Sequence, residues 1–262
     1  GMQAGCSGEP VKQVKAKLNV ADTFIFDSGK VLFPDYVKDG SFKAKLRTTL
    51  MTLNAYSAES MFWRHRDNDY IAMTHNNMNV DNAYWWRDTD GNLEIGVFDW
   101  GNMGSRSLGF KLWWWLYCGD HETLTANIDG YLQCFVDIYR EFGGPPLDAG
   151  ELKIQFMITA MEQMQALCNA VPQIFRMCPK KEWATIADRY DPRIGENIHG
   201  KSTLRLYLHV MSSIMRIMNE WKGAEALQTF VKDFTAQVPT LTKGQSVIWG
   251  DEGPPAGMLW TP

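Results

Sequence analysis

The chain has 262 residues and a formal net charge of −4, with 45% hydrophobic and 21% charged residues. This balance is typical of a folded globular protein and excludes a disordered chain, which has too little apolar surface to bury. The absence of a basic excess argues against nucleic acid or an anionic membrane as the partner. The longest apolar run, Leu112–Cys118, is far shorter than the ~20 residues that a membrane span requires.

Cysteine and histidine spacing indicates neither a disulfide framework nor a metal cluster. The five cysteines are widely spread without a C-x-x-C pair, and the five histidines form no H-x-x-x-H pair. Residues 1–20 contain no apolar stretch typical of a signal peptide. We therefore expect free thiols and a cytoplasmic location.

The first part of the chain is predicted to contain a short β-hairpin and then a helix. Thr23–Phe26 and Lys30–Phe33 are rich in β-branched and aromatic residues, and Asp27–Gly29 between them has the composition of a turn. A helix is predicted over 41–62, because apolar residues recur there at helical spacing and Ser41 can cap its first turn.

The next segment is predicted to form a strand and a second hairpin. Residues 70–74 have the pattern of a short strand. Ala83–Trp86 and Leu93–Phe98 are β runs, and Asp88–Asn92 between them is a clear turn. Because side chains alternate along a strand, one of the two adjacent tryptophans of this hairpin should face the core.

Residues 104–238 have helical periodicity almost throughout. The predicted helices are His121–Phe142, Asp148–Ala170, Lys180–Ala187, Ser202–Trp221 and Ala224–Val238. Methionines spaced by three and four residues on the second and fourth of these helices are expected in the core. Trp113, Trp114 and Trp115 would point in directions about 100° apart on a helix, so at least one should leave the core.

Two short segments, Thr74–Asn82 and Phe98–Gly101, carry the residue types of a phosphoryl-transfer site. Such a site needs a group near the acceptor hydroxyl, oxygen ligands for Mg²⁺ and a rigid loop that holds both. Asn77 and Asn82 have the spacing between base and metal ligand in H-x-D-x-x-x-x-N. Asp99 follows the hairpin and opens an Asp-Trp-Gly sequence, as the second metal-binding acid does in D-x-G.

These residues resemble the catalytic loop of the aminoglycoside phosphotransferase and choline kinase group, within the protein-kinase-like superfamily. His75-Asn76-Asn77 is similar to the His-Asn-Asp of choline kinases with its last residue amidated. The resemblance implies a mainly α fold with a small β-hairpin, the helical C-terminal lobe of a kinase. It also implies ATP and Mg²⁺ as cofactors, both bound by Asn82 and Asp99. His75 would brace the loop, and Asn77 would orient the hydroxyl of a small-molecule acceptor.

Two departures from the family pattern predict an impaired or inactive enzyme. The amide of Asn77 cannot accept the acceptor's proton, and loss of a general base typically costs ~10²–10⁴-fold in rate. The residues before 41–62 are too few for a five-stranded nucleotide-binding lobe, and they contain neither G-x-G-x-x-G nor V-A-I-K. That lobe is therefore absent, minimal, or supplied by a partner chain or a removed segment.

The predicted organisation has three parts. Residues 1–40 form an N-terminal segment with a loose start, a remnant or edge of a nucleotide-binding lobe. Residues 41–239 form the kinase-like helical lobe, with the catalytic loop and hairpin at 70–101, and 240–262 form a surface tail. Three functions stay open: an impaired small-molecule phosphotransferase, a pseudoenzyme that acts as a helical interaction module, and a helical scaffold whose Asn-rich loop is only a turn. The acceptor and a homo-oligomeric state also stay open.

Overall fold

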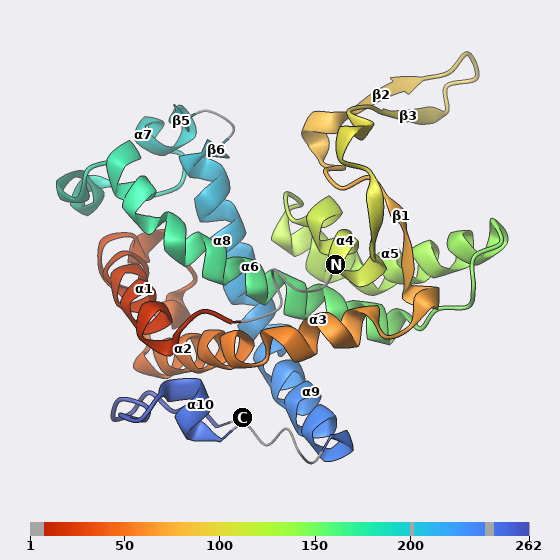
Figure 1. Ribbon diagram of the computed structural model, residues 1–262. Helices are drawn as coiled ribbons and strands as arrows, with labels where there is room; N and C mark the ends of the chain where they lie inside the picture. The colour runs from red at the N-terminus through yellow and green to blue at the C-terminus, as the bar shows by residue number, and fades with distance from the viewer. Residues whose placement is uncertain (1–7, 200–201, 239–243, 262) are drawn as a thin grey trace. The chain divides into compact units, whose positions relative to one another are not determined.

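The computed structural model describes residues 8–199, 202–238 and 244–261, and these are mainly helical (Figure 1). The chain divides into two compact units. The terminal unit contains the described residues up to 61 and from 160 onward, and the central unit contains residues 62–159. This division cuts the chain at other positions than the predicted boundaries at 40 and 239. Among the described helices, none is both long and apolar enough to cross a membrane.

The terminal unit is built from α-helices and short helical turns, with one minimal strand pair. Two helices run from one unit into the other, α3 (Ser57–His65) and α6 (Ala149–Met177). The remaining elements of the terminal unit are α1 (Val11–Thr23), η1 (Phe24–Ser28), η2 (Lys30–Leu32), η3 (Asp35–Lys38), α2 (Gly40–Ala55), η7 (Lys180–Thr185), α7 (Pro192–Gly195), β5 (Ile198–His199), β6 (Ser202–Thr203), α8 (Leu204–Asn219), α9 (Gly223–Gln237) and α10 (Gln245–Trp249).

The predicted β-hairpin at 23–33 is wrong, because these residues are helical. α1 passes directly into a five-residue π-helix, η1, and the 3₁₀ turn η2 follows. Phe24 and Ile25 are fully buried, and the Phe24 ring meets edge-on the rings of Phe33, Phe175 and Trp183. Packing thus overrides the β propensity of these residues. The described residues from 8 to 70 contain no strand, so they provide no sheet of a nucleotide-binding lobe.

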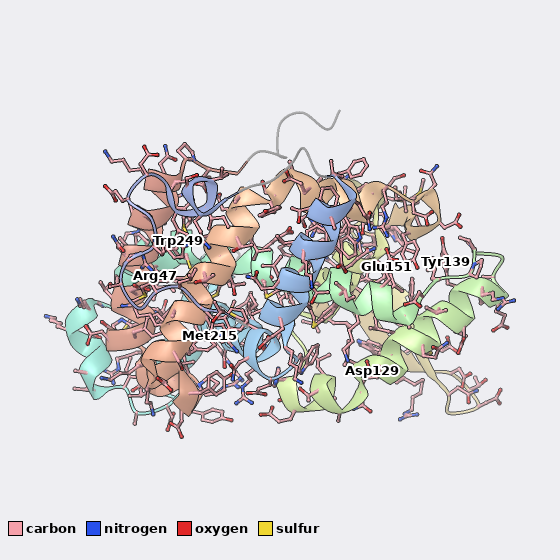
Figure 2. All side chains as sticks on the ribbon, turned by 90° about the horizontal axis from the view of Figure 1, so that it is seen from below. Arg47, Asp129, Tyr139, Glu151, Met215 and Trp249 are labelled. Carbon is pink, nitrogen blue, oxygen red and sulfur yellow. The ribbon has the colours of Figure 1, made fainter. Side chains whose placement is uncertain are left out.

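α2 is the buried centre of the terminal unit. It begins one residue before Ser41, because the Asp39 carboxylate accepts a hydrogen bond from the Ser41 amide at 3.1 Å and caps the first turn. The predicted single helix over 41–62 is in fact two helices, separated at Tyr56. The buried Arg47, labelled in Figure 2, donates to Asp22 of α1 at 2.7 Å. This ion pair fixes α1 on α2.

Both ends of the described chain also pack near α2. Residues 1–7 of the predicted loose start and 239–243 near the predicted tail lie outside the described residues. Glu9 exchanges two hydrogen bonds between its backbone and the Asn54 amide, at 2.8 and 2.9 Å. The tail is not confined to the surface, since the Trp249 side chain of α10 is fully buried (Figure 2) and Thr48 donates to the Met258 carbonyl oxygen at 2.8 Å.

The central unit combines two antiparallel strand pairs with helices. Besides the ends of α3 and α6, it contains η4 (Asn68–Tyr70), β1 (Ile71–Thr74), η5 (Val80–Asn82), β2 (Ala83–Arg87), β3 (Leu93–Val97), η6 (Trp100–Asn102), β4 (Gly104–Ser107), α4 (Leu108–Leu116) and α5 (His121–Glu141). β1 pairs with β4, and β2 pairs with β3. The predicted strand at 70–74 and the predicted hairpin are confirmed. β4 was not predicted, because its Gly-Ser-Arg-Ser sequence has no strand signature.

The four long helices predicted between 121 and 238 are confirmed, and the short helix predicted at Lys180–Ala187 is the 3₁₀ helix η7. α6 begins where expected, with the Asp148 carboxylate accepting from the Glu151 amide at 2.7 Å, but it continues through Pro172 to Met177. The predicted methionines of α6 and α8 are buried: Met157, Met161, Met164, Met211, Met215 and Met218. Trp113 is fully buried while Trp114 and Trp115 are half-buried, as the helical geometry predicts.

The β2–β3 hairpin projects from the rest of the central unit (Figure 1). The expectation that one of its two tryptophans faces the core is wrong, because Trp85 is 61% and Trp86 is 42% exposed. The Tyr84 ring stacks on the Trp86 ring, with ring centroids 5.2 Å apart. It also lies over Gly96 of the opposite strand, where a Cβ atom would overlap it. Both faces of this two-stranded ladder are therefore apolar and exposed.

α4 approaches α6 closely enough to exclude any side chain at Gly109. A Cβ there would lie 2.3 Å from the Cβ of Gln155, so the two helices would have to separate. We predict that Gly109→Ala lowers the free energy of unfolding by ~1–3 kcal/mol. Gly130→Ala, on the exposed face of α5 with nothing within 4 Å, should raise it by ~0.5–1 kcal/mol. Chemical denaturation of both variants checks the pair; a neutral Gly109→Ala would contradict the close helix contact.

Candidate functional site

A ring of four hydrogen bonds closes the loop that follows β1. His75 is buried, and its Nε2 lies 2.7 Å from the Phe98 carbonyl oxygen, at the end of the hairpin. Its Nδ1 accepts from the Asn77 amide at 3.2 Å. Because a carbonyl only accepts and an amide N–H only donates, the ring proton lies on Nε2. The histidine therefore joins the loop to the end of β3 in one defined orientation.

Asn82 provides the other half of this ring. Its side-chain Nδ2 donates to the Asn77 carbonyl oxygen at 2.6 Å, and its own carbonyl oxygen accepts from the Phe98 amide at 3.1 Å. The circuit His75–Phe98–Asn82–Asn77 is thus closed, and we call it the hydrogen-bond ring. The side chain of Asn82 is buried, so loss of one partner would leave a desolvated polar group, at a cost of ~1–3 kcal/mol. The ring holds the loop rigidly against the hairpin.

Asp99 comes directly after the ring, in a strained conformation. Its φ of 60° and ψ of 53° lie in the left-handed region, which an aspartate tolerates better than most residues but which still costs free energy. The Trp100 ring that follows packs edge-on against the His75 ring, with centroids 4.8 Å apart. The Asp99 side chain is exposed. A strained, exposed carboxylate beside a rigid loop is an arrangement found at functional sites.

The structure brings the four predicted site residues into one loop cluster. His75, Asn77 and Asn82 are members of the hydrogen-bond ring, and Asp99 is bonded to Phe98 of that ring. The Nδ2 of Asn82 is occupied, which leaves its Oδ1 as the side-chain oxygen for a ligand. Whether this oxygen and the Asp99 carboxylate share one cation stays a prediction.

The donor set fits a Mg²⁺ ion that phosphate groups help to bind. One carboxylate and one amide oxygen are hard oxygen ligands, and Mg²⁺ takes its other ligands from phosphates and water in nucleotide sites. Within the described residues, no group of three or more His, Cys, Asp or Glu side chains could hold a metal ion. A cation held by Asn82 and Asp99 would thus need further oxygen ligands, such as those of a nucleotide and water.

A recess of about 600 Å³ opens beside the loop. Its described lining consists of Asn76, Asn77, Gly101, Met103, Arg106, Phe110, Lys111 and Trp114, all of the central unit. The lining includes Asn77, which stands at the position of the family's base. It also includes two cations that were not predicted from the sequence, Arg106 of β4 and Lys111 of α4. A lysine at the centre of the otherwise apolar Leu108–Leu116 was the signal that could have drawn attention to this wall.

Helix α4 forms the wall that supports the loop. Lys111 donates from Nζ to the Asn76 carbonyl oxygen at 3.0 Å, and Trp115 donates from its indole to the His75 carbonyl oxygen at 3.1 Å. The pKa of Lys111 is lowered to about 8, first by burial and second by the positive charge of Arg106. A lysine with such a pKa is charged at pH 7, although it lies in a place that disfavours the charge.

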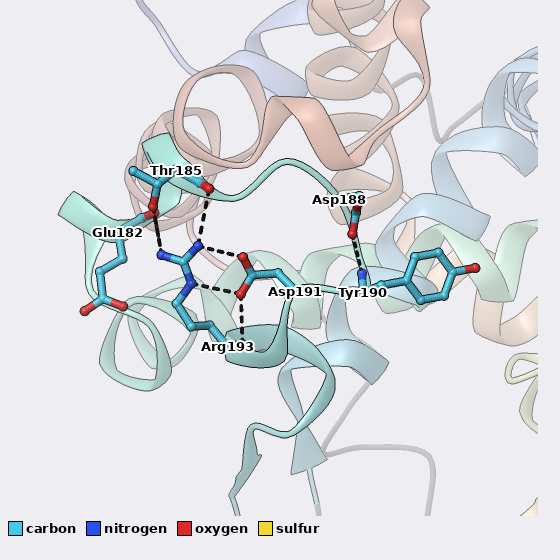
Figure 3. A network of polar contacts seen from close by, with 6 residues as sticks. All are labelled: Glu182, Thr185, Asp188, Tyr190, Asp191 and Arg193. Carbon is cyan, nitrogen blue, oxygen red and sulfur yellow. Dashed lines mark hydrogen bonds and ion pairs between the residues drawn. The ribbon is translucent and has the colours of Figure 1, made fainter.

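A second polar cluster, in the terminal unit, is complete in itself (Figure 3). The Arg193 guanidinium uses five donor contacts, two with the Asp191 carboxylate and three with the carbonyl or hydroxyl oxygens of Glu182 and Thr185. The hydrogen bonds from Arg193 lower the pKa of Asp191 to about 2. Because the guanidinium has no donor left for a ligand, this cluster orders the turn between η7 and α7 and is not a candidate site.

No protein-family model, curated protein or solved structure matches the chain. The resemblance to small-molecule phosphotransferases therefore stays a prediction that rests on the residues from 75 to 101 and on their arrangement.

The lowered pKa of Lys111 predicts a pH dependence of stability. From about pH 8 to pH 10.5, the unfolded chain keeps the lysine proton while the folded chain has lost it, so folding becomes more favourable as the pH rises. We expect the free energy of unfolding of the wild type to rise with pH over this range relative to Lys111→Met. Parallel curves for the two proteins, measured by urea unfolding, would show that the lysine pKa is not lowered.

Proposed function

We propose that the chain contains an impaired small-molecule phosphotransferase lobe of the protein-kinase-like type, with its catalytic loop in the central unit, which would pass the γ-phosphate of ATP to a hydroxyl acceptor. The observation that supports this best is the hydrogen-bond ring. It joins the position of the family's base, Asn77, to the position of its metal ligand, Asn82, and Asp99 follows the ring at once. The spacing of these residues in the sequence alone does not require such a connection.

Each residue of the loop has a role in this proposal. Mg²⁺, when bound with ATP by Asn82 and Asp99, would supply the positive charge that neutralises the phosphate oxygens. His75 is a positioning residue, since both of its ring nitrogens are engaged by backbone groups. Asn77 can accept or donate a hydrogen bond to an acceptor hydroxyl, but it cannot take its proton.

The proposed enzyme would also need groups that position the nucleotide phosphates. The described residues from 8 to 70 are helical or irregular, so they contain no sheet that could carry the anchoring lysine and the phosphate-covering loop of a kinase. Positioning and electrostatics supply most of the catalysis of phosphoryl transfer. A partner chain or a segment outside this sequence would have to supply them for full activity.

One observation favours a second candidate, the interaction module. Tyr84, Trp85 and Trp86 are all more than two-fifths exposed on a hairpin that carries apolar side chains on both faces. Exposed aromatic clusters of this kind mark interaction surfaces more often than isolated apolar residues do. A pseudoenzyme of the same fold would use this hairpin. For either candidate we propose the cytoplasm, because the four described cysteines are free thiols.

ATP turnover tests the proposed impairment. With Mg²⁺ and a panel of amino-alcohol and sugar acceptors, we expect the chain to turn over well below ~1 s⁻¹, the low end for kinases. Asn77→Asp should raise the rate by no more than ~10²–10⁴-fold, and should leave it short of full turnover, because the nucleotide side is still incomplete. A rate above ~1 s⁻¹ from either protein would contradict the proposed impairment.

Nucleotide binding tests the assigned metal pair separately from chemistry. We expect Mg²⁺ to strengthen ATP binding, measured by calorimetry, and Asp99→Asn to remove that effect of Mg²⁺. Asp90→Asn, which changes an exposed acid of the hairpin turn, is the matched control and should keep it. Equal Mg²⁺ dependence in both variants would remove Asp99 from the site, and no ATP binding by the wild type would favour the interaction module.

A further inference from the structure

The charged groups that line the recess are all cations. Arg106 of β4 and Lys111 of α4 both contribute to the lining, and the described lining residues include no carboxylate. Within the described part of the chain, neither side chain forms an ion pair. Among the residues that the structure describes, the Arg106 guanidinium donates only to the neighbouring Ser105 carbonyl oxygen, at 3.0 Å. No carboxylate of the described residues therefore forms an ion pair with this wall.

The lack of such a pair is costly for Lys111, because it is only 4% exposed. Its ammonium group has three donors, of which one reaches the Asn76 carbonyl oxygen at 3.0 Å. It also lies 5.1 Å from the centroid of the Phe110 ring, which offers a weak cation–π contact. Buried charges in proteins are normally paired, since an unpaired one loses its hydration without compensation. An anion in the recess would supply the missing partner.

Trp114 carries a further buried donor. It lines the same recess, and its indole N–H is buried without a hydrogen-bond partner. A buried donor left unsatisfied costs ~1–3 kcal/mol, and native structures contain few of them. The recess itself is lined by Arg106, Lys111 and the Trp114 residue, and its described lining contains no carboxylate.

We propose that this recess binds the oxyanion group, phosphate or carboxylate, of a small hydroxylated molecule. Arg106 and Lys111 would contact the oxyanion, while Met103, Phe110 and Trp114 would cover the apolar part of the molecule. Two cations in a chain of net charge −4 suit one small anion rather than a nucleic-acid backbone. The binding does not depend on phosphotransfer. Where the proposed function also holds, the bound molecule is the acceptor, because Asn77 lines the same recess.

The test uses three matched probes that share a glycerol skeleton: glycerol 3-phosphate, glycerate and glycerol. Binding is followed without ATP or Mg²⁺ through the indole N–H signals in a ¹H–¹⁵N NMR spectrum, with the Trp114 signal assigned from Trp114→Phe. We expect at least one of the two anions to shift the Trp114 signal in a saturable way, and glycerol to leave it unchanged. The stronger anion identifies the preferred group. Failure of both anions, or equal binding of glycerol, overturns the proposal.

Variants show whether the two cations are responsible. Arg106→Gln and Lys111→Met should each weaken binding of the better anion at least tenfold. Arg106 is exposed on β4, so its variant keeps the fold even if Lys111→Met does not. Arg140→Gln, which removes an exposed arginine of α5 outside the recess, is the matched control and should bind as the wild type does. Unchanged affinity in Arg106→Gln would overturn the assignment of the site.

These outcomes are separate from those of the proposed phosphotransferase. Anion binding measured without nucleotide supports the recess even if the protein neither binds nor cleaves ATP. Conversely, Mg²⁺-dependent ATP binding that requires Asp99, combined with no anion binding, would support the proposed function and reject this inference.

Discussion

The hydrogen bond from His75 to the Phe98 carbonyl oxygen is the interaction on which the candidate site depends. It joins a loop to a strand end that lies 23 residues further along the chain. Because the other ring nitrogen accepts from Asn77, and Asn82 bonds to both Asn77 and Phe98, the loop cannot shift without breaking several bonds. A side chain that replaced only one of the two ring nitrogens of His75 would keep only one of these two hydrogen bonds.

Helix α4 transmits the packing of the central unit to that ring. Its close packing against α6 requires a glycine at position 109. The hydroxyl of Ser107 also donates a hydrogen bond to the Gln155 side chain of α6, at 3.0 Å. The next turn of the same helix brings Lys111 and Trp115 under the carbonyl groups of the loop. The packing of α4 therefore determines the position of the loop. The same packing determines the shape of the recess between the loop and α4.

The proposed site combines features that would favour binding with features that would oppose turnover. Arg106 and Lys111 line a recess whose described lining has no carboxylate, and the backbone of Asp99 lies in the left-handed region. In the proposed phosphotransferase, the amide of Asn77 would stand where a proton acceptor is required. Such a protein could bind its ligand without the chemistry, because charge and shape would come from other residues than the base.

The sequence by itself determined the elements whose signals are local. The turn at Asp88–Asn92 and the helical periods of α5, α6, α8 and α9 predicted their structures, because turn chemistry and amphipathic spacing act within a few residues. The spacing of Asn77 and Asn82 also singled out the loop. Only the tertiary structure decided the rest. Phe24 lies in a helix because aromatic rings from distant parts of the chain pack around it. Residues 104–107 form the strand β4 because they pair with β1. Lys111 belongs to the candidate site because folding brings it to Asn76, 35 residues away. Contacts between distant residues leave no periodic trace in a single sequence.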